Sequence, residues 1–135
     1  EIVIVVDADW KKLYNSRSMH PIAEAEKVFF NNNNELVKAG KVLKEKESNG
    51  EFIGMIKLNS AGCEIFKTYY KIAKKKFLNK KFFNAKKFTN AYITDFLNFL
   101  VYNKIKIKCA KIKGGWMEID TIEDYLKAQS FFGKN

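Results

Sequence analysis

The first ten residues, Glu1 to Trp10, read EIVIVVDADW and set the fold class. Glu1 to Val6 is an almost continuous β-branched run, which is typical of a strand buried on both faces of a parallel or mixed sheet. The run ends abruptly in Asp7-Ala8-Asp9, so two carboxylates follow the strand directly. A strand of this kind needs neighbours and covering helices. We therefore expect an α/β fold that this chain enters partway through.

The rest of the chain alternates between strand and helix patterns, which differ in the spacing of their apolar residues. The turn Asn31 to Asn34 predicts a hairpin, and Gly54 within a strand predicts a bulge or a close backbone approach. The predicted strands are Ala25 to Phe30, Glu35 to Val42, Glu51 to Asn59, Lys104 to Lys113 and Trp116 to Ile119. The predicted helices begin at Asn59 or Ser60 and run to about Ala73, begin after Thr89, and begin after a cap at Thr121.

Composition narrows the function classes. The 135 residues suit one domain, and no apolar run is long enough to span a bilayer. The net charge of +10 comes almost wholly from lysine, since Arg17 is the single arginine, and reading bases or phosphates usually relies on arginine. Cys63 and Cys109 match no metal-ligand spacing, which favours buried free thiols. We expect a cytoplasmic protein that binds neither nucleic acid nor membrane.

Two acidic sites follow strand-like runs. The first is Asp7-Ala8-Asp9, and the second is Glu118-Ile119-Asp120 at the end of the predicted strand Trp116 to Ile119. Ligands of open α/β sheets collect at the carboxyl ends of strands, where two carboxylates could hold Mg²⁺ and support displacement at phosphorus. Aspartates at strand ends also cap helices, and that structural role is an equal alternative here.

Several segments resemble small-molecule nucleotidyltransferases. The segment Gly114 to Tyr125, GGWMEIDTIEDY, is similar to the C-terminal signature of the cytidylyltransferases that act on phosphocholine and on aminoethylphosphonate. Four further segments resemble that group and the nucleotidyltransferase domains associated with phosphoenolpyruvate mutase. They are IVIVVDADW (Ile2 to Trp10), HPIAEAEKV (His20 to Val28), GEFIGMIKL (Gly50 to Leu58) and AYITDFLNFL (Ala91 to Leu100).

The resemblance implies the C-terminal part of a Rossmann-like, GT-A-like nucleotidyltransferase fold with a mixed sheet. It implies transfer of a nucleotide from a nucleoside triphosphate, CTP first, to a small phosphorylated or phosphonylated substrate, with release of pyrophosphate. It further implies Mg²⁺ bound by Asp9 and Asp120, with Asp7 as the alternate for the first position. The residues placed to grip the acceptor are Trp10, Glu51, Tyr92, Asp95 and Trp116. For Trp10, Trp116 and Tyr92, core packing is an equally good explanation.

The chain departs from the family in one respect. The glycine-rich LAAGxGxR loop and the following Pro-Lys, which hold the triphosphate, have no counterpart in residues 1–135. We therefore expect a partial nucleotidyltransferase domain that binds nucleotide poorly alone, and that pairs with another copy or with a missing N-terminal portion. The alternatives are a sugar-1-phosphate nucleotidyltransferase, a non-catalytic interaction fragment and a nucleic-acid binder through Lys71 to Lys87. His20, beside Pro21, has no ligand-type residue next to it in the sequence, which favours a surface or structural role.

Overall fold

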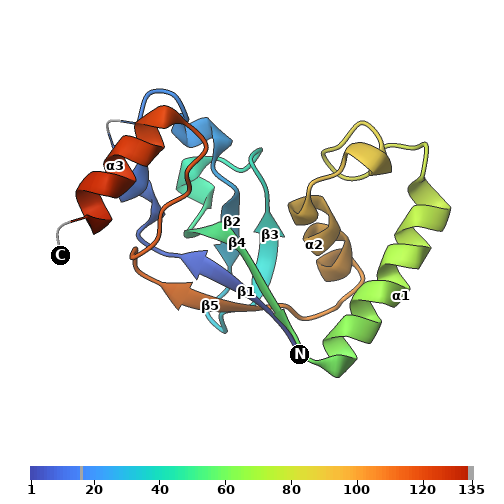
Figure 1. Cartoon of the computed structure of the whole chain (residues 1–135). Coiled ribbons are helices and arrows are strands. Elements are labelled where there is room, and N and C mark those ends of the chain that lie inside the picture. The colour runs from blue at the N-terminus through green and yellow to red at the C-terminus, as the bar shows by residue number, and fades with distance from the viewer. Residues whose placement is uncertain (16, 134–135) are drawn as a thin grey trace.

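The computed structural model describes residues 1–15 and 17–133, and in it five strands form one mixed sheet in the order β3-β2-β4-β1-β5 (Figure 1). The strands are β1 (Ile2–Asp7), β2 (Lys27–Phe30), β3 (Leu36–Ala39), β4 (Gly50–Leu58) and β5 (Lys108–Ile112). Strand β1 pairs antiparallel with β4 and parallel with β5, and the β2–β3 hairpin joins the sheet through β2. The predicted α/β class with a mixed sheet is confirmed.

The first strand is central, as its composition requires, but its two faces differ. Ile2, Ile4 and Val6 are at most 2% exposed and belong to the main core, whereas Val3 and Val5 are only partly buried. The prediction of burial on both faces is therefore correct for one face and too strong for the other. The helices that complete the main core lie against the face of Ile4, so the opposite face keeps some contact with solvent.

A bulge separates two halves of the β1–β4 ladder. Ile4 pairs with Ile56 while Val6 pairs with Phe52, so the register shifts between them. Gly54 lies within the shifted part of β4 at φ +81°, a conformation that side chains with a Cβ rarely adopt. The bulge predicted from this glycine is confirmed, and Gly54 also lines the cavity described below.

The edges of the sheet approach each other at one end. The amide of Leu36 donates to the carbonyl of Ile107 at 2.8 Å, and the amide of Cys109 donates to the carbonyl of Asn34 at 2.8 Å. These bonds connect the start of β3 to β5, the two edge strands. The hairpin predicted around the asparagine turn is confirmed, with Asn34 at φ 54°.

Three α-helices complete the fold, α1 (Ser60–Phe77), α2 (Ile93–Tyr102) and α3 (Ile122–Phe132). Helices α1 and α2 lie together on one side in Figure 1, and α3 lies on the other side. The predicted caps are confirmed, since Asn59 accepts from Gly62 N and Thr121 accepts from Asp124 N. Helix α1 continues beyond its predicted end because lysine is a good helix former and the ring of Phe77 packs edge-on or tilted against Phe82 and Phe99.

One predicted element is wrong. Trp116 to Ile119 forms no strand, because Gly114 and Gly115 at φ 66° and 80° turn the chain away from β5. A short 3₁₀ helix, η1 (Trp10–Tyr14), follows β1. None of the described helices is long and apolar enough to cross a membrane.

Candidate functional site

A cavity of about 230 Å³ beside the bulge gathers an unusual number of carboxylates, and we call it the acidic cavity. Five acidic side chains line it, together with Lys41, His20 and the indole of Trp116; the acids are Glu24, Glu26, Glu51, Glu118 and Asp120. Lys41 is paired with Glu24 at 2.8 Å, which leaves the remaining acids without a lysine or arginine partner in the cavity wall. Such a cavity favours a cation.

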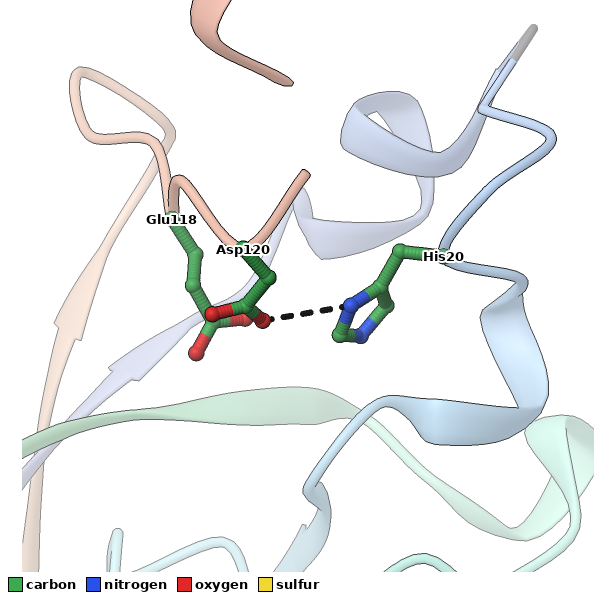
Figure 2. Close-up of side chains that lie close together, drawn as sticks. All are labelled: His20, Glu118 and Asp120. Atoms are coloured by element: carbon green, nitrogen blue, oxygen red, sulfur yellow. Dashed lines mark ion pairs between the residues drawn. The ribbon is translucent and has the colours of Figure 1, made fainter. Parts of the chain in front are cut away.

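His20 and Asp120 meet at one side of this cavity (Figure 2). His20 Nδ1 lies 3.2 Å from Asp120 Oδ2, and Glu118 contributes a further carboxylate oxygen so that the three ligand atoms all lie within 4.8 Å of one another. Partial burial, and then the negative charge of Asp120, raise the pKa of the Glu118 carboxyl. The fold thus supplies the partner that the sequence around His20 does not contain.

Glu51 is the most deeply buried acid of the cavity, with 3% exposure. Its Oε1 accepts a hydrogen bond from the hydroxyl of Tyr14, whereas its Oε2 has no partner among the residues that the structure describes. Burial raises the pKa of the Glu51 carboxyl to about 7, and the nearby Glu118 adds to the rise while the Tyr14 hydrogen bond opposes it. A buried carboxylate with a free oxygen is costly unless a ligand neutralises it.

The first turn of α3 holds the loop that carries His20. Asp124, 1% exposed, accepts from Arg17 Nε at 2.6 Å and from the backbone amides of Asp120 and Thr121. Glu123 accepts from the amide of Ser18 at 3.0 Å, and from that of Met19. The Arg17 hydrogen bond holds the pKa of the Asp124 carboxyl well below its usual range. These contacts fix the two chain segments that meet at the cavity.

Asp7 serves as an anchor at the end of β1. It is fully buried, and its Oδ1 accepts from the amides of Asp9 at 2.8 Å and Gly114 at 3.0 Å. Its Oδ2 accepts from Trp116 Nε1 at 2.8 Å. Both oxygens are therefore used to bind the 114–116 turn, which directs the following segment toward the acidic cavity.

Asp9 lies in a different place from Asp120. It lines a second cavity, of about 610 Å³, between the end of β1 and α3, together with Asp7, Lys12 and Lys113. Asp9 Oδ2 accepts from Lys12 Nζ at 2.9 Å, and this hydrogen bond lowers the pKa of the Asp9 carboxyl. The two aspartates predicted to share Mg²⁺ thus face separate cavities, and their joint role stays a prediction.

The other predicted acceptor residues divide into three settings. Glu51 and Trp116 line the acidic cavity with Asp120. Tyr92, 60% exposed, lines a separate aromatic hollow between α1 and α2 and contacts Lys41. Asp95 is 2% exposed and caps α2 by accepting from the amides of Tyr92 and Asn84. Trp10 is 2% exposed and packs with Tyr14 in a small core cluster. The contacts seen for Asp95 and Trp10 are structural, and their acceptor roles stay predictions.

Comparison with known proteins agrees with the resemblance seen in the sequence. No protein-family model matches the chain. The chain is similar to a curated protein, the CTP:phosphoglutamine cytidylyltransferase of Campylobacter jejuni, with 29% identity over 124 residues. The match covers 92% of this chain and 47% of the relative, so the chain spans about half the length of the relative. The predicted similarity to small-molecule cytidylyltransferases is confirmed.

Proposed function

We propose that this chain provides the acceptor side of a cytidylyltransferase active site. In the reaction, a phosphate or phosphonate oxygen of the acceptor attacks the α-phosphorus of CTP. The bond between the α-phosphorus and the oxygen that bridges to the β-phosphorus breaks, and pyrophosphate leaves with that oxygen. The observation that carries the proposal is the acidic cavity, which occurs in a chain similar to a cytidylyltransferase and is lined by three of the residues predicted from sequence. The parallel pairing of β1 and β5 supports the proposed GT-A-like relationship.

The chemistry of the cavity favours an acceptor with a cationic nitrogen. Aminoethylphosphonate and phosphocholine carry an ammonium group, and the acceptor named for the relative, phosphoglutamine, derives from an amino acid. Glu51 Oε2 and Glu26 Oε2 are buried with no partner in the described part of the chain. An ammonium group would neutralise this pair, and Trp116 lines the same cavity, where an aromatic residue suits a cation.

A sugar-1-phosphate acceptor is the second candidate. Carboxylates also accept hydrogen bonds from sugar hydroxyls, so the polar wall of the cavity is compatible with it. A neutral sugar ring, however, leaves the charge of Glu51 uncompensated in a buried position. The cationic acceptor is therefore the better match to the cavity.

A divalent metal fits part of the predicted ligand set. Asp120 is exposed and its Oδ2 faces His20 Nδ1 at 3.2 Å, whereas both oxygens of the buried Asp7 are occupied by three donors. Asp9 would first have to release Lys12. We propose Asp120 as the principal Mg²⁺ ligand and Asp9, which lines the separate cavity at the end of β1, as a second one. A bound Mg²⁺ supplies charge neutralisation to the phosphates.

The function is tested in two steps. Calorimetric titration of this chain with aminoethylphosphonate, phosphocholine, phosphoglutamine and glucose-1-phosphate measures acceptor preference, and tighter binding of glucose-1-phosphate would reject a cationic acceptor. Pyrophosphate release from CTP is then followed in a chimera in which this chain replaces the matched part of the Campylobacter enzyme. Asp120→Asn should abolish most turnover, and Asp9→Asn should do the same if Asp9 is the second ligand.

A further inference from the structure

Helices α1 and α2 lie side by side (Figure 1), and a hollow of about 810 Å³ remains between them, the aromatic hollow that Tyr92 lines. Six aromatic side chains line it: Phe66, Tyr70, Phe82, Phe88, Tyr92 and Phe96. Small-molecule sites in proteins are typically concave and mostly apolar, with volumes of about 300–1,000 Å³. The aromatic hollow has these properties, and the proposed cytidylyl transfer does not use it.

The floor of the aromatic hollow is fixed by core packing. Phe82 and Phe96 are buried and belong to the main core. The ring centroid of Phe88 lies 5.1 Å from that of Phe82 and 5.7 Å from that of Tyr70. Tyr70 and Tyr92, by contrast, are at least half exposed, so their rings still offer apolar surface to a ligand. Rings prefer to pack offset or edge to face with other rings, so these walls favour an aromatic ligand.

The charge around the aromatic hollow is positive, in contrast to the acidic cavity. No carboxylate lines it among the residues that the structure describes, whereas Lys67 and Lys74 of α1 both do. The Lys74 ammonium forms no ion pair within residues 1–15 and 17–133. Lys67 is paired with Glu64 at 2.9 Å, but both side chains are exposed, and such a pair contributes little, so Lys67 can exchange Glu64 for a ligand. Charge complementarity therefore favours an anion.

We propose that the aromatic hollow binds a small organic anion with an aromatic body, whose ring packs against Tyr70 and Tyr92 and whose carboxylate or phosphate lies beside Lys74. This site is distinct from the acidic cavity, whose carboxylates repel such a ligand. The two sites are nevertheless adjacent. Ile93 lines both, and the Nζ of Lys41, in the wall of the acidic cavity, lies 5.1 Å from the ring centroid of Tyr92.

Binding is measured by isothermal titration calorimetry on the 135-residue chain without CTP or acceptor, so the result does not depend on the proposed function. The probes are 1-naphthoate, its neutral analogue 1-naphthamide, and octanoate, an anion without a ring. We expect 1-naphthoate to bind at least about threefold more tightly than either analogue. Equal affinity for 1-naphthamide or for octanoate would overturn the proposal, as would no binding of 1-naphthoate up to about 10 mM.

Two variants alter the hollow itself. Tyr70→Ala removes an aromatic wall and should weaken 1-naphthoate binding by about tenfold. Lys74→Gln removes a positive charge and should lower the preference for 1-naphthoate over 1-naphthamide by about threefold. The matched controls are Tyr102→Ala on α2 and Lys75→Gln on α1. Both residues are exposed and line none of the cavities described above, so both variants should bind as the parent does.

Circular dichroism confirms folding of each variant, and Tyr70→Leu, which keeps an apolar side chain without a ring, replaces Tyr70→Ala if the latter does not fold. Parent-like affinity for 1-naphthoate in the folded Tyr70 variant would overturn the proposal. Sedimentation velocity tests a second copy of this chain as the occupant. A dimer that the Tyr70 variant dissociates, together with no effect of 1-naphthoate on that dimer, would overturn the proposal in favour of self-association.

Discussion

Glu51 permits a prediction that connects stability to function. Its carboxyl has a pKa of about 7 in the folded chain, against an ordinary value of 4.5, chiefly because it is buried. An unfolded chain therefore releases this proton near pH 4.5, while the folded chain holds it up to about pH 7. Over that interval the folded state binds more protons, so its stability falls as pH rises. The difference of about 2.5 pKa units corresponds to a loss of about 3 kcal/mol.

Glu51→Gln removes the titrating group and keeps an oxygen that can accept from Tyr14. We expect the difference in unfolding free energy between variant and parent to shift in favour of the variant by about 2–3 kcal/mol from pH 5 to pH 8. Urea unfolding at several pH values, followed by tryptophan fluorescence, measures this difference. The same variant should bind aminoethylphosphonate more weakly than the parent, because the cavity loses its buried negative charge. Residues placed for ligands often reduce stability in this way.

Two outcomes would contradict this reasoning. If the difference between variant and parent stays constant from pH 5 to pH 8, Glu51 keeps an ordinary pKa and the cavity does not disfavour its charge. If the difference changes in favour of the parent, some group in the cavity stabilises the carboxylate, and the free Oε2 has a partner in solution. Glu118 and Glu26 also have raised pKa values, but both remain in each protein, so their own titration largely cancels.

Three further substitutions test the supports of the site. Asp124→Asn leaves Arg17 buried without its carboxylate and should lower the unfolding free energy by about 3–5 kcal/mol, measured by urea unfolding above pH 4. The lowered pKa of Asp124 means that the carboxylate stabilises the folded state throughout this range and loses that effect only in strongly acidic solution. Trp116→Phe removes the indole donor to Asp7 and should cost about 1–3 kcal/mol in the same assay, with a parent-like circular dichroism spectrum. Asn98→Ala breaks two hydrogen bonds between α2 and the backbone of Ala39 and should cost about 2–3 kcal/mol, measured by thermal and urea unfolding.

Local patterns were enough to predict most of the elements. The β-branched run before Asp7, the asparagine turn and the caps at Asn59 and Thr121 act within a few residues, so their effect can be deduced from sequence alone. The segment Trp116 to Ile119 was predicted as a strand because its composition permits one. Its actual course depends on the indole of Trp116 reaching Asp7, more than a hundred positions earlier in the chain.

Contacts between residues far apart in the sequence also explain which site residue the sequence analysis missed. Asp120 and Glu51 were predicted from segments that resemble the cytidylyltransferases, and both line the acidic cavity. His20 was assigned a surface or structural role because its neighbours in sequence offer no ligand, yet Asp120 lies 3.2 Å away in space. A signal was present, since both residues belong to the quoted segments. Only the fold, through α3 and Asp124, shows that the segments meet.

We propose that the distribution of charge makes the acidic cavity selective for a ligand with a cationic group. The chain carries a net charge of +10 and most of its lysines are exposed, while five carboxylates gather in one small cavity. The outer field attracts anions such as phosphates over a distance of about 8 Å at physiological salt. The cavity repels the same anions at short range and accepts a cation. In a ligand with a phosphoryl group at one end and a cationic nitrogen at the other, the positive surface attracts the phosphoryl group and the cavity carboxylates attract the nitrogen. A simple anion is attracted only by the positive surface. We propose that this opposition orients a zwitterionic acceptor, with its nitrogen toward Glu51 and its phosphoryl oxygens outward, toward the proposed metal and nucleotide.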